Sequence, residues 1–265
     1  MTVIGAIFRP QLPPERLRSV VTAAEEAGLA ELWLWEDCFL ESGIATAAAA
    51  LAWTERLRIA IGVLPVPLRN VALTAMEVAT LHRLFPGRVT VGVGHGVQQW
   101  MAQVGAGAES PLTLLREHLD ALRALLRGQE VTTEGRYVRL DAVALGWPPH
   151  TPPAVVCAAT GPRTLRLSGA AADGTVLHAG TPLDQVRQAR RLIDEGRAEA
   201  GRTDRHPLIA YVQSGNGDPE TVAGIARDRA RAGADHVVLE PAGDEPDPEG
   251  FVRMAAEVGT LVGKD

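Results

Sequence analysis

The sequence predicts an α/β fold, and within that class a (β/α)8 TIM barrel, from three observations. Short β-branched or aliphatic runs alternate with longer amphipathic or alanine-rich runs along all 265 residues, which is the pattern of parallel strands joined by helices. The alternation contains eight strand-then-helix units, the number that closes a barrel. The first strand runs into Arg9-Pro10-Gln11 without a glycine, whereas the competing doubly wound sheet usually has a glycine fingerprint there.

The expected strands are short apolar runs, as buried parallel strands are. They cover Val3–Phe8, Leu32–Trp35, Arg58–Val63, Val89–Val93, Ala154–Ala158, Thr175–His178, Leu208–Gln213 and Val237–Glu240. Gly28 and Gly128 stand at helix C-caps, and Pro86-Gly87 ends a third helix. The expected helices cover Pro14–Ala27, Ile44–Thr54, Val71–Phe85, Leu112–Arg127, Pro162–Ala171, Leu183–Ala200, Pro219–Ala232 and Glu249–Val262.

Three stretches lie between these units. Glu130–Leu140 is expected to form a small hairpin, the proline-rich Trp147–Pro153 a loop, and the acidic Asp244–Glu249 a solvated loop. No low-complexity linker or shift in charge divides the chain, so a single domain over residues 1–265 is expected.

Composition excludes several function classes. A net charge of −6 argues against nucleic acid or an anionic membrane as a partner. No apolar window approaches the roughly 18 residues of a membrane span, and Met1–Arg9 lacks a signal-peptide pattern. The two cysteines, Cys38 and Cys157, are too few for a disulfide framework and favour a cytoplasmic location. Lys264, the only lysine, stands beside the C-terminus, which argues against Schiff-base and pyridoxal-phosphate chemistry.

Candidate functional residues are those at the carboxyl ends of the expected strands, where barrel enzymes carry their active sites. These include Arg9, Glu36, Asp37, Cys38, His178, Gln213 and Glu240. A metal site is not expected, because the first strand has no histidine and no two of the seven histidines have ligand spacing. His95 and His178 are the pair that a barrel mouth would bring together. The other five histidines are expected on the surface or in helix packing.

Two glycine-containing segments indicate ligand binding. Gly92-Val93-Gly94-His95-Gly96 fails the G-x-G-x-x-G spacing, but glycines at a strand end let a flat ligand approach the backbone. Ala159-Thr160-Gly161-Pro162-Arg163 places a proline at the first position of a helix. The free N–H groups of that first turn, the Thr160 hydroxyl and Arg163 favour an anion there. Simple helix capping is the alternative explanation.

Four segments in this order resemble the bacterial luciferase-like family of flavin- and deazaflavin-dependent oxidoreductases. The resemblance is greatest to the branch that uses coenzyme F420, an 8-hydroxy-deazaflavin that moves hydride and not single electrons. The segments are Gly28 to Asp37, Thr54 to Val63, Pro86 to Gly94, and Ala159-Thr160-Gly161-Pro162-Arg163 through to Gly174.

The resemblance implies roles for individual residues. The Gly62–Val63 bond is expected to be the family's non-prolyl cis peptide, a bulge that supports the cofactor ring from behind. Asp37 matches an acidic residue that hydrogen-bonds the ring edge. The expected cofactor-tail residues are Gly94, His95 and Gly96, and the expected phosphate-binding residues are Ala159, Thr160, Gly161 and Arg163.

This chain departs from the family pattern in two places. Cys38 stands where relatives often have histidine after the acidic residue, so the proton donor is expected to be Cys38, Glu36 or His178, unless the substrate differs. The loop between Gly96 and Pro111 is also shorter than in most relatives, which suits a bulky substrate such as a peptide or a complex natural product.

Three functions follow as hypotheses. The first is an F420-dependent oxidoreductase that reduces a C=C, C=N or C=O bond, or runs the reverse reaction. The second is an FMN-dependent monooxygenase of the same fold, and the third is a non-catalytic flavin-binding accessory protein. A homodimer is expected, because relatives commonly associate through the region of the alanine-rich helix Thr46–Leu51.

Overall fold

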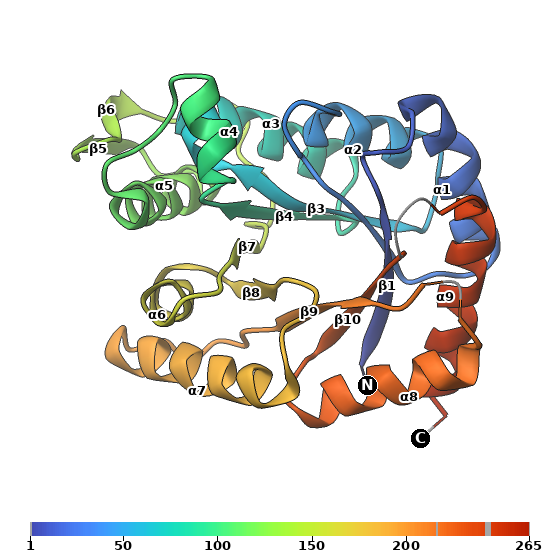
Figure 1. Ribbon diagram of the computed structural model, residues 1–265. Helices are drawn as coiled ribbons and strands as arrows, with labels where there is room; N and C mark the ends of the chain where they lie inside the picture. The colour runs from blue at the N-terminus through green and yellow to red at the C-terminus, as the bar shows by residue number, and fades with distance from the viewer. Residues whose placement is uncertain (1, 216, 242–244, 265) are drawn as a thin grey trace.

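The structure, a computed structural model, describes residues 2–215, 217–241 and 245–264. The barrel strands are β1 (Val3–Phe8), β2 (Glu31–Leu34), β3 (Arg58–Pro65), β4 (Val89–Gly94), β7 (Val155–Ala158), β8 (Gly174–Leu177), β9 (Leu208–Gln213) and β10 (His236–Glu240). They pair in parallel and close in the order β1-β10-β9-β8-β7-β4-β3-β2 (Figure 1). The predicted (β/α)8 barrel is therefore confirmed.

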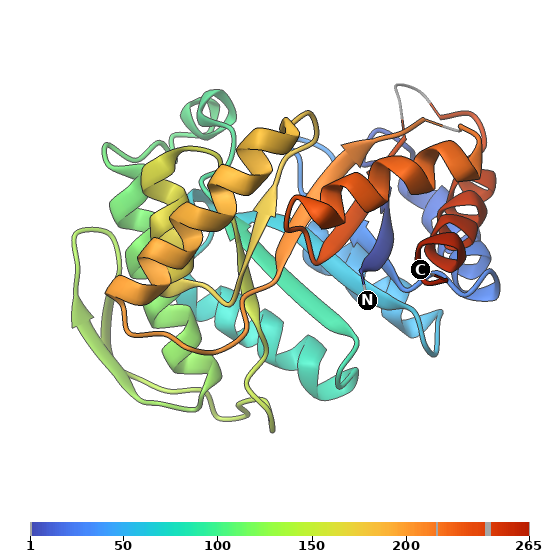
Figure 2. The ribbon, with the colours of Figure 1, turned by 90° about the horizontal axis from the view of Figure 1, so that it is seen from below.

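Helices surround the barrel, and the same layering is visible from below (Figure 2). The α-helices are α1 (Leu17–Glu26), α2 (Gly43–Ala52), α3 (Val71–Leu84), α4 (Gln98–Gln103), α5 (Pro111–Leu126), α6 (Pro162–Ala171), α7 (Leu183–Glu199), α8 (Pro219–Arg231) and α9 (Pro248–Val262). Two short 3-10 helices are η1 (Pro14–Arg16) and η2 (Val66–Leu68), and β5 (Val131–Glu134) pairs with β6 (Arg139–Val143) in the expected hairpin. Within the described residues, no helix has the length and apolarity that a membrane crossing requires.

The structure differs from the expected elements in four places. The first helix begins as η1 before α1, β3 continues past its expected end to Pro65, and α4 was not predicted. The expected solvated loop Asp244–Glu249 is wrong in part: Asp244 lies outside the described residues, Glu245 is buried, and the Asp247 side chain accepts the Gly250 N–H at the start of α9.

Large side chains fill the lower part of the barrel and leave its upper part open. The interior cluster consists of Ile7, Trp33, Ala60, Val156, Val176, Ile209, Tyr211 and Val238. At the start of β2, the Glu31 carboxylate accepts from Trp33 Nε1 at 3.0 Å and lies 3.0 Å from His236 Nδ1. These contacts compensate a buried carboxylate, because an unpaired charge in the interior would destabilise the fold. They also fix the Trp33 ring inside the barrel.

Candidate active site

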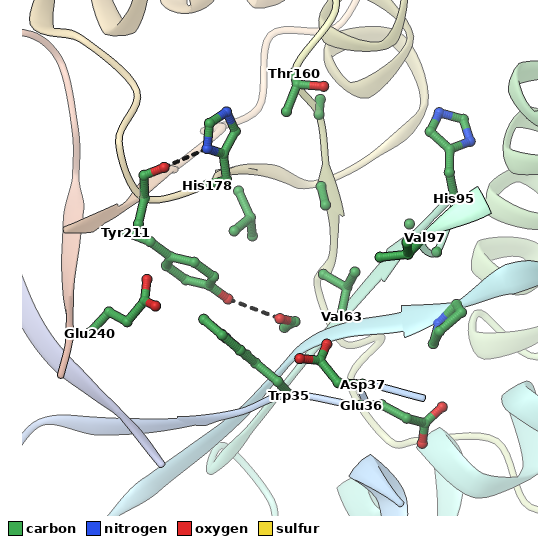
Figure 3. Close-up of a pocket in the computed structure, with 18 of the residues that line it drawn as sticks. Trp35, Glu36, Asp37, Val63, His95, Val97, Thr160, His178, Tyr211 and Glu240 are labelled. Atoms are coloured by element: carbon green, nitrogen blue, oxygen red, sulfur yellow. Dashed lines mark hydrogen bonds between the residues drawn. The ribbon is translucent and has the colours of Figure 1, made fainter. Parts of the chain in front are cut away.

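A cavity of about 600 Å³ opens at the carboxyl ends of the barrel strands, the end at which barrel enzymes carry their sites. Its wall contains most of the residues predicted from the sequence: Glu36, Asp37, Gly62, Val63, Gly94, His95, Gly96, Ala159, Thr160 and His178 (Figure 3). Cys38, Gly161 and Arg163 are not part of this wall. The structure therefore brings most of the residues predicted from the sequence together around one cavity.

A bulge in β3 forms one side of the cavity. The pairing of β3 with β4 shifts between Ile61 and Leu64, and the Gly62–Val63 peptide bond is cis, as predicted. The Val63 side chain packs over two glycines of β4. A Cβ on Gly92 would lie 2.6 Å from Val63 Cγ1, and one on Gly94 would lie 2.8 Å from Val63 Cγ2. The glycines of β4 are therefore needed to accommodate the bulge.

Aromatic rings form the floor. The Tyr211 ring stacks on Trp35 with 5.8 Å between centroids and meets Trp33 edge-on at 5.6 Å. The Tyr211 hydroxyl donates to the Gly62 carbonyl at 3.2 Å, which ties β9 to the β3 bulge. Burial raises the pKa of Tyr211 well above its usual value, so this hydroxyl keeps its proton and remains a hydrogen-bond donor.

Charged groups gather beside Trp35. Arg9 Nη1 lies 3.6 Å from Glu240 Oε1 and donates to the Pro241 carbonyl at 3.2 Å, and the guanidinium lies 6.0 Å from the Trp35 ring centroid. Burial raises the pKa of Asp37, against the opposing effect of Arg9. Burial also raises the pKa of Glu240. The positive charge of Arg9 opposes this rise, and the negative charge of Asp37 adds to it. Both carboxyls therefore hold a proton more readily than free carboxyls do.

Glu36 and Cys38 differ from Asp37 in what they contact. The Glu36 carboxylate binds Arg69 at 2.7 Å and accepts the Gly43 N–H at 2.7 Å, so it anchors the start of α2. Arg69 also pairs with Glu77 at 2.6 Å. The pKa of Cys38 is raised by burial and by the carboxylates of Glu36 and Asp37, so the thiol is protonated at neutral pH. The Cys38–Phe39 bond is also cis.

The two histidines of the wall have different surroundings. His178 is exposed, and its Nδ1 faces the Ala179 carbonyl. His95 is half-buried, with Nε2 at 3.4 Å from Thr164 Oγ1. Burial lowers the pKa of His95, so its ring is neutral at pH 7.

The start of α6 lies at the far side of the cavity from Glu240. Thr160 belongs to the cavity wall, and Ala159 is buried behind it. Gly161 is the N-cap of α6, has no side-chain cap, and is followed by Pro162. Arg163 is exposed, outside the wall. The first-turn N–H groups that follow Pro162 are the kind of donors that bind anions at helix starts.

Sequence reasoning gave no role to several residues that shape the cavity. Arg9, Gln213 and Glu240 were recognised only as strand ends, and Trp35, Trp100 and Tyr211 were not singled out. The alternation along β2 was the available signal for Trp35, because Trp33 and Trp35 are two residues apart and face the same side of a strand.

The remaining histidines form no metal centre. Within the described residues, no three His, Cys, Asp or Glu side chains are placed to hold a metal ion. His118 is buried on α5. His206 is buried in a loop, where its Nε2 lies 2.8 Å from Thr175 Oγ1.

A closed barrel with a bulged strand over glycines at its mouth defines a TIM-barrel protein with an open cavity at the carboxyl ends of its strands. A model of the luciferase-like monooxygenase family matches residues 3–216. The chain belongs to this family, and the predicted family is confirmed.

Relatives in sequence are named as F420 or pterin enzymes. The chain is 26% identical to a 5,10-methylenetetrahydromethanopterin reductase of Methanolobus tindarius, over 98% of this chain and 79% of the relative. It is 31% identical to an F420-dependent glucose-6-phosphate dehydrogenase of Nocardia farcinica, over 79% of this chain and 68% of the relative. The prediction of an oxidoreductase agrees with these relatives.

Solved structures share the fold. The coenzyme F420-dependent tetrahydromethanopterin reductase of Methanopyrus kandleri has a TM-score of 0.85 at 20% identity, covering 97% of this chain and 98% of that one. An F420-dependent secondary alcohol dehydrogenase, solved with an F420-acetone adduct, has a TM-score of 0.87 at 20% identity, covering 98% and 99%. The monooxygenase RslO1 of Streptomyces bottropensis has a TM-score of 0.85 at 17% identity, covering 100% of both.

Proposed function

We propose that this protein is an oxidoreductase that uses coenzyme F420 to transfer hydride to or from an organic substrate at a C=C, C=N or C=O bond. The observation that carries the proposal is the Val63 bulge over Gly92 and Gly94, which forms one wall of an apolar cavity. Relatives in sequence that are named for F420 support the choice of cofactor.

The residues present fit a tricyclic ring with an anionic tail. A Cβ on Gly62 would lie 2.0 Å from the Tyr211 hydroxyl, so the backbone is as close to the floor as glycine permits. Val63 would support the ring, Asp37 would contact its edge, and the backbone from Gly94 to Gly96 would follow the tail. The Thr160 hydroxyl and the first-turn N–H groups of Gly161 and Arg163 would hold the phosphate.

When bound, the deazaflavin supplies hydride transfer. The protein positions the reacting groups and excludes water with Trp35, Tyr211 and Val63. Of the proposed proton-holding residues, Asp37 is best placed, because it lines the cavity and burial raises its pKa. Glu36 is engaged by Arg69, and Cys38 stands outside the wall. His178 remains the second candidate, since it also belongs to the wall.

The alternative is an FMN-dependent monooxygenase, which the family's description and the likeness to RslO1 favour. Titration of the purified protein with oxidised F420 and with FMN, followed by absorbance and fluorescence, separates the hypotheses. F420 binding without FMN binding supports the proposal. FMN binding alone supports the monooxygenase, and binding of neither cofactor leaves only an accessory role.

Three further features belong to the proposal. The substrate is a small organic molecule or a bulkier, peptide-like one, and the short 97–110 segment contributes Val97 and Trp100 to the cavity wall that it would meet. The location is cytoplasmic, in keeping with the free thiols of Cys38 and Cys157.

The protein is proposed to be a homodimer in which the region around α2 takes part. Half of the small residues of α2 are buried against its own barrel, Ala45 and Ala52 are exposed, and the neighbouring α3 exposes Leu73, Met76 and Leu84. Light scattering on the eluting protein tests this proposal. A mass of twice 28.1 kDa supports it, and a monomer at micromolar concentration refutes it.

A further inference from the structure

The cavity of the proposed function has an uneven distribution of charge. Glu36, Asp37 and Glu240 belong to its wall, whereas none of the described wall residues is an arginine or lysine. Because Arg69 engages Glu36, two carboxyls remain to act on the contents of the cavity.

Among the described residues, Arg9 is the cation that acts on both carboxyls. Arg9 lies 3.6 Å from Glu240 and donates to the Pro241 carbonyl, which orients it toward β10. The Asp37 side chain makes no hydrogen bond or ion pair with any described residue, although it is half-buried. Arg9 pairs with Glu240 and also acts on Asp37, so its one positive charge offsets only part of the charge that the two carboxylates carry when both are ionised.

The unbalanced charge lies at one end of the cavity. Figure 3 shows Glu240, Trp35 and Asp37 on one side of Val63, with Thr160 and His95 on the other. The start of α6, where an anion is proposed to bind, thus lies away from the acidic end of the same cavity. The acidic end also has aromatic rings, since Trp35 and Tyr211 both belong to the cavity wall. Carboxylates beside aromatic rings are the combination that recognises organic cations.

We propose that the acidic end of the cavity, formed by Asp37, Glu240 and Trp35, binds a substrate that carries a positive charge, such as a protonated amine or an iminium ion. This deepens the proposed function and rests on it only for the redox chemistry. The raised pKa values of Asp37 and Glu240, caused mainly by burial, agree with it, because a bound cation would stabilise the ionised forms of two carboxyls that have lost much of their contact with water. A carboxylate or phosphate ester at this end would face repulsion.

Three probes of one shape and different charge test the inference. Benzylamine, benzyl alcohol and benzoate share one ring and are positive, neutral and negative near neutral pH. Isothermal titration into the protein, with and without saturating F420, measures their dissociation constants. We expect benzylamine to bind about tenfold more tightly than benzyl alcohol, with benzoate weakest. Equal affinities, or a preference for benzoate, would overturn the inference.

Matched variants assign the preference to the cavity. Asp37→Asn keeps the shape and leaves Arg9 paired with Glu240, so the preference for benzylamine should fall to about twofold. Asp141→Asn makes the same change in net charge on exposed β6 and should keep the full preference. A preference that survives Asp37→Asn would contradict the assignment.

The F420 titration of the same samples separates the two proposals. An amine preference without F420 binding would sustain the cation site and refute the proposed function. F420 binding without an amine preference would support the proposed function and refute the cation site.

Discussion

Substituting Gly62 by alanine tests the geometry on which the site depends. The new Cβ would lie 2.0 Å from the Tyr211 hydroxyl and 2.6 Å from Trp33 Cε3, both far inside van der Waals contact. Trp33 is 1% exposed and has no room to withdraw, and movement of Tyr211 into the cavity would break its hydrogen bond to the Gly62 carbonyl. Trp33 is also held by its hydrogen bond to Glu31.

Overpacking of this kind costs about 1–3 kcal/mol or more, and two rigid rings place Gly62→Ala near the upper end. We expect a loss of about 3 kcal/mol in the free energy of unfolding, or roughly 6–12 °C in Tm, measured by urea and thermal unfolding. Gly146→Ala is the control, since its Cβ would have no heavy atom within 4 Å. The double variant Gly62→Ala, Tyr211→Phe should lose less free energy of unfolding than the two single variants lose together. A Gly62→Ala protein within 0.5 kcal/mol of wild type would refute the packing described here.

Three further changes have defined outcomes. Arg69→Met leaves the half-buried Glu36 without its ionic partner and should cost about 1–3 kcal/mol in urea unfolding; a loss below 0.5 kcal/mol would show that the pair is not structural. Val63→Ala should weaken F420 binding about five- to tenfold through lost apolar contact, and an unchanged dissociation constant would remove Val63 from the ring site. Burial, assisted by Arg69, lowers the pKa of His118 from 6.5 to about 4. Between pH 6.5 and pH 4, the unfolded chain therefore takes up a proton on this histidine and the folded protein does not. The free energy of unfolding decreases as the pH is lowered through this range, by about 1.4 kcal/mol per pH unit. His118→Phe should make the pH dependence between pH 6.5 and 5 shallower by that amount, and an unchanged slope in urea unfolding would contradict the effect.

The barrel was predictable because parallel strands buried on both faces appear as short apolar runs. The predicted end of an element was wrong where strand pairing continues beyond the local apolar run of the sequence. The β3 strand continues through Leu64 and Pro65 because these residues pair with Val93 and Gly94 beyond the bulge. No sequence signal near Pro65 reports a partner on another strand.

The charged part of the site was hidden for a related reason. Arg9 and Glu240 meet because β1 and β10 are neighbours in the closed barrel, although they lie near opposite ends of the chain. Glu36 was proposed as a catalytic residue from its place after β2, and only the structure places Arg69 beside it. Residue types at strand ends thus predicted which side chains gather around the cavity, whereas pairing between distant residues decides which carboxyls are engaged by an arginine.

The central claim is that the cavity beside Val63 holds the ring of a deazaflavin. A crystal structure of the protein soaked with oxidised F420 tests it most directly. The ring should lie against Val63 and above Tyr211, with the phosphate at the Thr160 turn. Density for the ring elsewhere, or Val63 turned away with its cavity closed, would contradict the claim.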